Sequence, residues 1–280
     1  MLHFQLFRIK VYPSKQGFLF ESSQTPSEIL YKAILSKPTA EFRKGVFWHI
    51  GNVHELMDSG LYFRIGKISK STIEIYNNGN FEEMEFESAP YTHVILDANL
   101  EICGIAQKMK LSPRPIGIAN RLIRLLNDST IAHRIHAKFE ILPINDPTDF
   151  INYLQRALII SKFWITFSRP NAWDVNEDFI KPMEKLAESS GADKGKTEIE
   201  GENLEYKNLK ELAKSAASTG DDAGASLQMD VTGRKIKKSI KGNHVIIQYQ
   251  DVTESEQKIQ FLQTIKNYYR KIRNSAELNI

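Results

Sequence analysis

The sequence has few of the features that mark a secreted or membrane-bound protein. Cys103 is the one cysteine among 280 residues, which excludes an intramolecular disulfide framework and a multi-cysteine zinc module. No run approaches the ~20 consecutive apolar residues that a membrane-spanning helix needs. Residues 1–11 alternate between apolar and polar and carry charge, unlike a signal peptide. We therefore expect a cytoplasmic protein without membrane insertion.

Signatures of catalysis are also lacking. The chain contains no G-x-S-x-G, G-x-G-x-x-G or H-E-x-x-H motif and no protein-kinase motif set. Residues 191–197 resemble a phosphate loop, but the segment is one residue short of the consensus and acidic residues follow it. His49 and His54 are too few for a zinc site, and Asp97 and Glu101 match no nuclease spacing. We assign no catalytic residue, no metal ligand and no cofactor, and the balance of the sequence is against an enzyme.

The overall composition is typical of a soluble globular protein. Hydrophobic residues make up 41% of the chain and charged residues 25%, and 280 residues can bury one large core or two ordinary ones. Strand patterns dominate the first half, and strands mix with helices in the second half, which ends in a long helix. This order predicts an α+β fold with a strand-rich region over residues 1–110 and a mixed region over residues 111–280.

The first half contains clear local signals. Thr25 and Glu28 form a capping box around Pro26, which predicts the start of a helix. Asn77-Asn78-Gly79-Asn80 separates two alternating runs and predicts a hairpin, and a second hairpin is expected over residues 91–106. Further expected elements are strands over residues 2–11, 47–50 and 61–65 and a short helix over residues 53–57.

The second half alternates between helical and strand patterns. A helix is expected from Pro115 to about Asn127. A strand over residues 134–142, a helix from residue 146 to about 160 and a strand over residues 163–167 have the spacing of a β-α-β unit. The remaining expected elements are helices over residues 176–188 and 204–217, a polar loop over 189–201 between them, a hairpin joining 226–231 to 245–249, and a last helix over 253–273.

Charge is segregated along the chain. Residues 174–230 carry 7 basic and 14 acidic residues, a net charge of −7. Residues 231–280 carry 10 basic and 4 acidic residues, a net charge of +6. The basic block is the electrostatic footprint of a protein that meets phosphate, and the acidic block is a solvated face or a partner for the basic block in another subunit.

The basic block contains the candidate binding residues. Five of the eight residues from 234 to 241 are basic and lie between two predicted strands, as in a hairpin arm that neutralises the phosphates of duplex DNA. The last helix adds cations, with Tyr268 and Tyr269 among them. The predicted nucleic-acid contacts are Arg234, Lys235, Lys237, Lys238, Lys241, Arg270, Lys271 and Arg273. A third basic group comprises Lys108, Lys110, Arg114, Arg121 and Arg124. No sequence-reading module is visible, so we expect backbone-dominated, sequence-tolerant binding.

The segment Ile165-Thr166-Phe167-Ser168-Arg169-Pro170-Asn171 is a strand that closes on Arg-Pro-Asn before an acidic helix. Together with the hairpin over residues 91–106 and the run Val245-Ile246-Ile247-Gln248-Tyr249, it resembles an uncharacterised family of bacterial and mobile-element proteins. The order of elements over residues 90–275 is similar to that of the RexA type of phage-exclusion protein and, through it, to RdgC-type DNA-binding proteins. The resemblance implies a DNA-associated homodimer with a role in phage defence or exclusion, and it supplies no catalytic residue.

Three classes of function stay open. The first is sequence-tolerant binding of DNA, with double-stranded DNA and backbone contacts expected, which best fits the charge distribution. The second is a protein-interaction or scaffold subunit of a defence system, with a partner protein from the same operon. The third is a metal-dependent nuclease whose site is assembled from scattered carboxylates.

Overall fold

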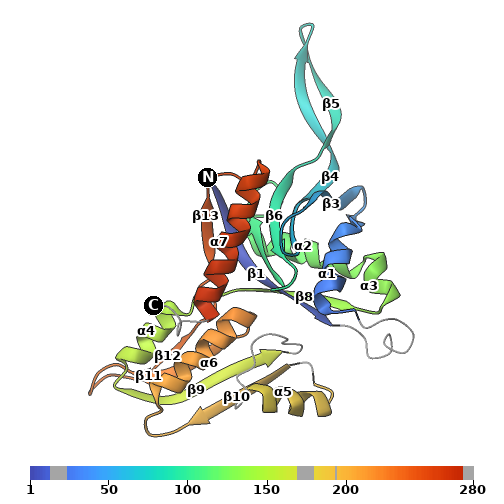
Figure 1. The fold of residues 1–280 in the computed structure, drawn as a ribbon. Helices are drawn as coiled ribbons and strands as arrows, with labels where there is room; N and C mark the ends of the chain where they lie inside the picture. The colour runs from blue at the N-terminus through green and yellow to red at the C-terminus, as the bar shows by residue number, and fades with distance from the viewer. Residues whose placement is uncertain (13–23, 169–179, 193, 274–280) are drawn as a thin grey trace. The chain divides into compact units, whose positions relative to one another are not determined.

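The computed structural model describes residues 1–12, 24–168, 180–192 and 194–273 (Figure 1). Strands make up 42% of the described residues and helices 31%, with antiparallel sheets and a long C-terminal helix. This confirms the predicted α+β class. The Arg-Pro-Asn segment that contributes to the family resemblance lies outside the described residues.

The chain divides into two compact units, and each is built from segments that are far apart in the sequence. Unit 1 comprises Met1–Gln5, Val11–Ile141 and Ile247–Leu262. Unit 2 comprises Leu6–Lys10, Leu142–Ile246 and Gln263–Ile280. The predicted division at residue 110 runs along the sequence and stays a prediction.

The elements up to residue 134 form most of unit 1. In chain order they are β1 (Leu2–Tyr12), α1 (Pro26–Leu35), β2 (Thr39–Arg43), β3 (Val46–Glu55), β4 (Gly60–Asn77), β5 (Asn80–Ser88), β6 (Tyr91–Asp97), β7 (Ile102–Ala106), α2 (Pro115–Asn127) and α3 (Thr130–Arg134). The larger sheet has nine strands in the order β13-β1-β7-β6-β4-β3-β2, with β5 paired to β4 and β8 paired to β1. The remaining elements are β8 (Lys138–Pro143), α4 (Thr148–Arg156), β9 (Ile159–Ser168), α5 (Ile180–Ser189), β10 (Lys194–Glu200), α6 (Tyr206–Thr219), β11 (Ala223–Gln228), β12 (Ile236–Ser239), β13 (Ile246–Tyr249) and α7 (Ser255–Arg273).

Helices α1 and α2 form where the sequence predicts them, whereas the sequence gives no prediction of α3. In α1, the Thr25 hydroxyl accepts a hydrogen bond from the backbone N–H of Glu28, and the Glu28 carboxylate accepts one from the N–H of Thr25. This capping box satisfies two amides that the first turn leaves unpaired. The apolar residues of α1 and α2 are buried, and both helices contact β3. The two helices thereby cover one face of the sheet.

Strands β4 and β5 continue beyond the sheet as a two-stranded ribbon over residues 69–88 (Figure 1). The predicted hairpin is confirmed, with Asn77 paired to Asn80 across the turn. Asn78 has a φ of 47° and Gly79 a φ of 90°, the left-handed conformations that asparagine and glycine tolerate in tight turns. The ribbon carries five glutamates and one lysine, a net charge of −4.

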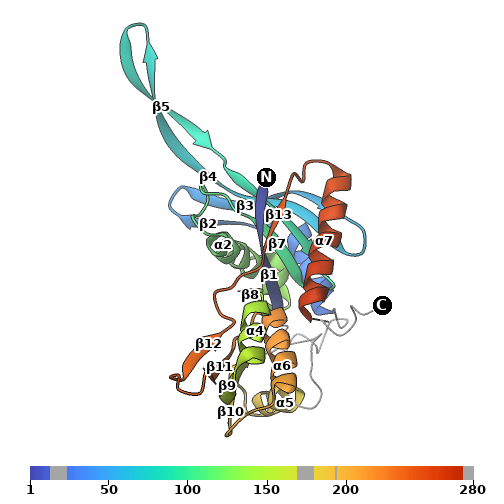
Figure 2. The same cartoon turned by 90° about the vertical axis from the view of Figure 1, so that its left-hand side faces the viewer.

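Unit 2 is built on a four-stranded antiparallel sheet in the order β10-β9-β11-β12. Helices α4, α5 and α6 pack against it from one side (Figure 2). Buried Phe163 and Ile165 of β9 and buried Leu212 and Ala216 of α6 form the core between the two layers. Small residues such as Ala213 and Ala217 let α6 approach the sheet closely.

Several predicted connections are wrong. The strand over residues 134–142 begins only at Lys138 and belongs to the larger sheet, whereas β9 belongs to the smaller one, so the two do not form a β-α-β unit. The predicted hairpin of residues 226–231 and 245–249 does not form, because β11 pairs with β12 and β13 joins β1. Periodicity identifies strands but does not identify their partners.

Two local predictions are also wrong. Residues 189–201 are not all loop, because residues 194–200 form strand β10, in which charged exposed residues alternate with half-buried Gly195, Thr197 and Ile199. Charged side chains are typical of an edge strand, and here they conceal the strand pattern. The expected short helix over residues 53–57 is absent from this described segment, since β3 runs to Glu55 across a register shift between Gly51 and His54.

Candidate nucleic-acid interface

The small sheet of unit 2 has one face against helices and an opposite face whose outer strands are exposed. Along β9, Phe163 and Ile165 point toward the helices, so the alternate residues Lys162, Trp164 and Thr166 lie on the opposite face. Directly opposed residues of antiparallel strands share a face, which places the neighbouring residues. We call the following set the open face: Lys162, Trp164 and Thr166 of β9, Lys196, Glu198 and Glu200 of β10, Gly224 and Ser226 of β11, and Lys237 and Ser239 of β12.

An aromatic ring lies at the centre of the open face. Trp164 is half-buried and is the register partner of Gly224 on the neighbouring strand. A Cβ atom at Gly224 would overlap the Trp164 indole, so the ring lies directly against the backbone of β11. On the other side, the Lys196 ammonium is 5.6 Å from the ring centroid, within the range of a cation–π interaction. The absence of a side chain at Gly224 thus leaves room for the indole against β11.

Charges of both signs surround this ring. The Lys162 ammonium donates a hydrogen bond of 2.7 Å to the Glu198 carboxylate and also pairs with Glu200. These two acceptors raise the pKa of Lys162, and Lys162 with Lys196 lowers the pKa of Glu198. Lys162 and Glu198 are therefore ionised at neutral pH, and the glutamates offset much of the positive charge on this side.

Two cavities lie on either side of Trp164 along the strands. One, of about 530 Å³, is lined by Lys162, Ser226 and Lys235 together with Glu200 and Glu202. The other, of about 570 Å³, begins two residues beyond Trp164 at Thr166. At ~3.3 Å per residue, the four residues from Lys162 to Thr166 separate the cavities by about 13 Å. A cavity, the indole and a second cavity thus follow one another along β9.

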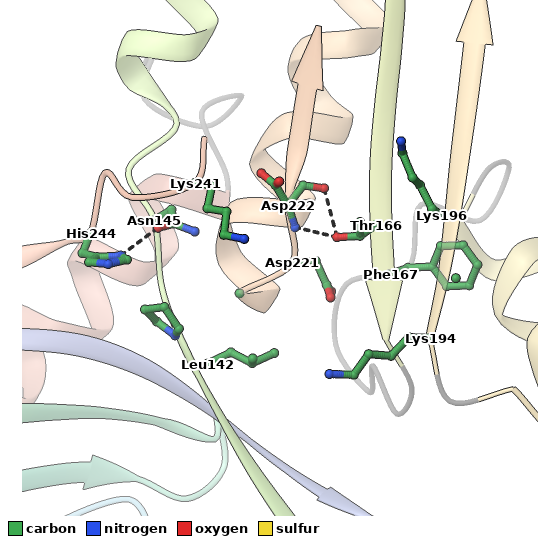
Figure 3. A pocket seen from close by; sticks show the side chains of 13 residues that line it. Leu142, Asn145, Thr166, Phe167, Lys194, Lys196, Asp221, Asp222, Lys241 and His244 are labelled. Carbon is green, nitrogen blue, oxygen red and sulfur yellow. Dashed lines mark hydrogen bonds between the residues drawn. The ribbon is translucent and has the colours of Figure 1, made fainter. Parts of the chain in front are cut away.

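The larger cavity gathers cations from two segments and carboxylates from a third. It is lined by Lys194 and Lys196 of β10, Lys241 after β12, and Asp221 and Asp222 between α6 and β11. Figure 3 shows Lys194 and Lys241 directed into it from different segments. Further lining residues are Leu142, Pro143, Asn145, Thr166, Phe167, Gly195, Gly220 and His244.

Neutral polar groups complete this cavity. His244 Nδ1 is 3.0 Å from the Asn145 side-chain oxygen, and burial lowers the pKa of His244, so the imidazole is neutral at pH 7. Asp222 donates its backbone N–H to the Thr166 hydroxyl at 2.7 Å. Burial raises the pKa of the Asp222 carboxyl, while the nearby Lys241 ammonium opposes that shift. The cavity therefore offers three ammonium groups beside two carboxylates.

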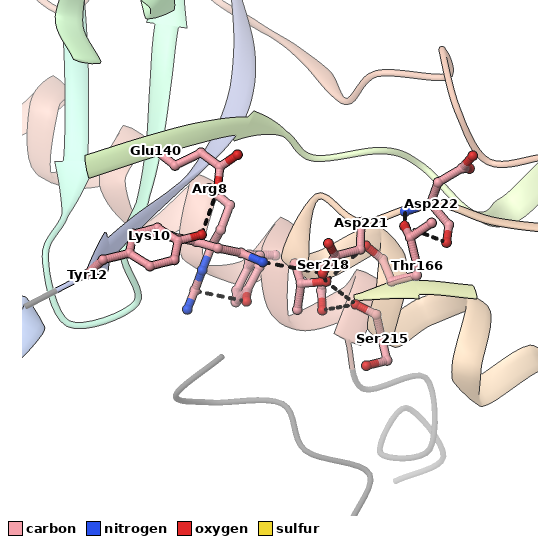
Figure 4. Close-up of polar contacts among 12 residues, drawn as sticks. Arg8, Lys10, Tyr12, Glu140, Thr166, Ser215, Ser218, Asp221 and Asp222 are labelled. Atoms are coloured by element: carbon pink, nitrogen blue, oxygen red, sulfur yellow. Dashed lines mark hydrogen bonds and ion pairs between the residues drawn. The ribbon is translucent and has the colours of Figure 1, made fainter. Parts of the chain in front are cut away.

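The second carboxylate, Asp221, is engaged within the protein. Its Oδ2 atom lies 3.3 Å from the Lys10 ammonium and accepts a hydrogen bond of 2.7 Å from the Thr219 hydroxyl (Figure 4). The Lys10 side chain is 1% exposed and that of Asp221 is 8% exposed. A buried ion pair of this kind is costly to break, because removing one partner leaves a charge in an apolar environment. Asp221 is therefore a structural neighbour of the cavity.

The structure divides the predicted basic cluster between the two faces of the sheet. Lys237 is exposed on the open face, and Lys235 and Lys241 line the two cavities. Lys238 is opposite Ala225 on the face toward the helices, with its ammonium 4.4 Å from the centroid of the Tyr153 ring. Arg234 is exposed in the turn before β12. One of the five residues thus lies on the open face, and two line the cavities beside it.

The predicted cations of the last helix lie elsewhere in unit 2. Arg270 and Lys271 are exposed, and Arg273 is half-buried. Lys271 lines a separate cavity of about 300 Å³ with residues of α4 and α6, among them Lys210. Tyr269 is 1% exposed and its hydroxyl accepts a hydrogen bond from Arg8, so this ring belongs to the core and is not available for base stacking.

The third basic group lies in unit 1, where two of its arginines contact aromatic side chains. The Arg121 guanidinium is 5.1 Å from the centroid of the Phe42 ring, and that of Arg124 is 4.2 Å from the same ring. Arg124 also pairs with Asp128 one turn later at 3.6 Å. These contacts are typical of a packed helix surface.

Sequence reasoning missed Lys162, Trp164, Lys194 and Lys196. The sequence predicts a strand over residues 163–167 but assigns none of its residues to a site. The available signal was the alternation Lys-x-Trp-x-Thr over residues 162–166, which places polar and aromatic residues on one face. Lys194 and Lys196 lay in the predicted loop.

The described residues show where the catalytic candidates of the sequence lie. Within these ranges, no group of three or more histidine, cysteine, aspartate or glutamate side chains is placed to hold a metal ion. The Asp97 carboxylate accepts a hydrogen bond from the backbone N–H of Leu100 in a turn. Burial raises the pKa of the Cys103 thiol, which makes it a weak nucleophile. The phosphate-loop-like segment contributes Lys194 to Thr197 to strand β10, not to a loop before a helix.

No family model matches the chain, and no curated protein matches it as a relative. In the part of the chain that the structure describes, every helix is too short or too polar to cross a membrane. The open face and its two cavities are therefore the main basis for a functional assignment.

Proposed function

We propose that this chain binds nucleic acid, with DNA as the expected ligand, through the open face of unit 2. The observation that carries the proposal is the Trp164 indole lying on Gly224 between two lysine-lined cavities. Proteins that bind nucleic acid without reading sequence combine cationic grooves for phosphate with aromatic side chains for bases. The open face has both components within one sheet.

The charges of the open face support sequence-tolerant binding. Lysines contact phosphates as point charges, which position the ligand and carry no sequence information. Lys196 and Lys237 are exposed on the outer strands, where no other part of the described fold neutralises Lys237. The Glu198 carboxylate beside Lys196 reduces the local charge, so binding should be moderate in strength and sensitive to salt.

The test is fluorescence anisotropy of labelled oligonucleotides across a salt series. The double variant Lys196→Gln, Lys237→Gln removes two cations of the open face and keeps two polar side chains. Each lost phosphate contact should flatten the slope of log affinity against log salt by ~0.7 for a single strand or ~0.9 for a duplex. We expect a combined change of about 1.4 or 1.8, respectively.

The matched control is Lys185→Gln, Lys207→Gln. Both lysines are exposed and lie on helices α5 and α6, so the variant has the same net charge without touching the open face. Its salt slope should equal that of the wild type. If both double variants change the slope equally, binding depends on total charge and the open face is not the interface.

In the cell, we propose that the chain acts as a homodimer in phage defence or exclusion. This rests on the resemblance in the order of elements over residues 90–275. Sedimentation velocity would establish the oligomeric state, and plating efficiency of phage on cells expressing wild type or the Lys196→Gln, Lys237→Gln variant would test the role. Full protection by a variant that no longer binds DNA would contradict the link between the two.

The ribbon of β4 and β5 favours a second candidate, a protein-interaction subunit of a defence system. Ile73, Met84 and Phe86 lie on one side of the ribbon and are exposed. Glu74 and Glu83 are directly opposed on the other side, a like-charge pair that is unfavourable without a cation. The expected occupant is therefore a basic protein surface. Replacing Glu74 and Glu83 by glutamine should abolish its capture while leaving DNA affinity unchanged.

A further inference from the structure

We propose that the ligand of the open face is a single strand of nucleic acid, with one base stacked on Trp164 and the backbone passing from one cavity to the other. This inference rests on the proposed function and specifies the form of the ligand. It differs from the expectation of duplex DNA that a basic hairpin arm suggests.

The position of the ring favours an unpaired base. Trp164 lies against β11 at Gly224 and is only half-buried, so part of its indole is open to solvent beside the Lys196 ammonium. In a duplex, bases stack on one another and present only their edges in the grooves. An unstacked base of a single strand presents its whole face, and single-strand-binding proteins use aromatic rings on a sheet to receive it.

The cations are placed along the path of a nucleic-acid strand that runs over the open face in the direction of β9. Lys235 and Lys162 line the cavity before Trp164, and Lys194, Lys196 and Lys241 line the cavity after it. Phosphates on either side of a stacked base would reach these two groups. By contrast, major-groove recognition needs a helix or a two-stranded ribbon that protrudes into the groove. The cations of the open face lie on a sheet surface and in its cavities.

The carboxylates that line the two cavities are also compatible with a single-stranded ligand. Glu200 and Glu202 line one cavity and Asp222 the other, so each cavity carries negative as well as positive charge. Carboxylates accept hydrogen bonds from the exocyclic amino groups of bases, which are accessible in a single strand. A mixed lining of lysines and carboxylates thus fits a ligand that exposes both phosphates and base edges.

The experiment compares four ligands of equal length by anisotropy: single-stranded DNA, single-stranded RNA, duplex DNA, and an abasic DNA strand that keeps the phosphates but lacks bases. The variants are Trp164→Ala and Trp164→Phe, with folding checked by circular dichroism. The wild type should bind the single strands more tightly than the duplex. Trp164→Ala should lose ~5- to 150-fold in affinity for the base-bearing strands, the effect of one stacked base.

Three further comparisons between variants and ligands make the test specific. Trp164→Phe should recover most of the affinity, because its ring can still stack on a base. The wild type and Trp164→Ala should bind the abasic strand equally, and their salt slopes should agree because the phosphate contacts are unchanged. Comparison of DNA with RNA shows whether the sugar contributes to recognition.

The outcomes separate this inference from the proposed function. Duplex bound as tightly as single strands, or equal affinity of wild type and Trp164→Ala for single strands, overturns the single-strand inference and leaves nucleic-acid binding in place. Absence of binding to every ligand at low salt overturns the proposed function itself. If Trp164→Ala weakens binding of the abasic strand as much as that of the others, the ring acts by holding the sheet together and stacking is refuted.

Discussion

Replacing Gly224 by alanine tests whether the indole lies where the structure places it. A Cβ atom at this position would overlap the Trp164 ring and would approach the carbonyl oxygen of Lys238 to 2.8 Å. Real Cβ atoms do not tolerate such distances, so the ring must move off β11 and the strand pair must shift. Overpacking of this kind costs about 1–3 kcal/mol. The lower freedom of alanine in the unfolded chain offsets about 0.4–1 kcal/mol of that.

We therefore expect Gly224→Ala to lower the free energy of unfolding by about 1–2 kcal/mol. Urea unfolding followed by far-ultraviolet circular dichroism measures it without using tryptophan fluorescence. In a Trp164→Ala background the clash with the ring is absent and only the Lys238 carbonyl remains. The double-mutant cycle should give a coupling of about 1 kcal/mol between the two sites.

Gly51→Ala is the matched control. Gly51 lies in a strand with ordinary backbone angles, and a Cβ atom there has open space around it. We expect it to leave stability unchanged or to raise it slightly, because only the effect on the unfolded chain remains. If Gly224→Ala behaves like Gly51→Ala, or shows no coupling to Trp164, then the ring does not lie on β11 and the open face lacks its stacking platform.

Three further outcomes follow from the charges. Asp221→Asn should lower the stability of unit 2 by at most about 3–5 kcal/mol in urea unfolding, because it removes the carboxylate that lies 3.3 Å from the buried Lys10 ammonium; a Lys10→Met, Asp221→Leu variant should recover part of this loss. Burial, and next the Arg64 guanidinium, lower the pKa of His93, so its neutral form stabilises the fold above pH 6.5 and this contribution is lost as pH falls through the lower folded value. Urea midpoints at pH 7.5 and 5.5 should therefore differ less in His93→Gln than in the wild type. Shortening the acidic ribbon by replacing residues 72–85 with a tight turn should leave DNA affinity unchanged, and a clear loss would assign the ribbon to the interface.

Elements with signals of their own could be predicted from the sequence. The capping box at Thr25 and Glu28 and the turn at Asn78 and Gly79 are each local, because a few neighbouring residues determine the backbone conformation. Strand pairing is not local. Residues 245–249 read as a strand, yet nothing in their pattern says that they join β1 instead of the strand at residue 226. That choice depends on how distant apolar faces pack together.

The open face could not be predicted from the sequence for a different reason. Its residues alternate with the core residues of the same strand, and both sets contain large side chains, as in the segment Lys162-Phe163-Trp164-Ile165. Which set is buried depends on the side of the sheet that α4 and α6 cover, and this is a tertiary property. The edge strand β10 was missed because Lys194, Lys196 and Glu198 make it look like a polar loop.

Because successive side chains of a β-strand point to opposite faces, basic residues that are clustered in sequence do not all lie on one face. Lys237 and Lys238 are neighbours in sequence but lie on opposite sides of β12, so a count of cations along the chain overstates the charge of either face. Conversely, residues 174–230 have a net charge of −7 but supply Lys194 and Lys196 to the open face together with Glu198 and Glu200. The face is thus less positive than residues 231–280 suggest, and phosphate contacts alone should hold a strand weakly at physiological salt. The indole of Trp164 contributes a stacking energy that salt does not screen, which makes the ring, more than any single lysine, the feature whose removal should weaken binding most under those conditions.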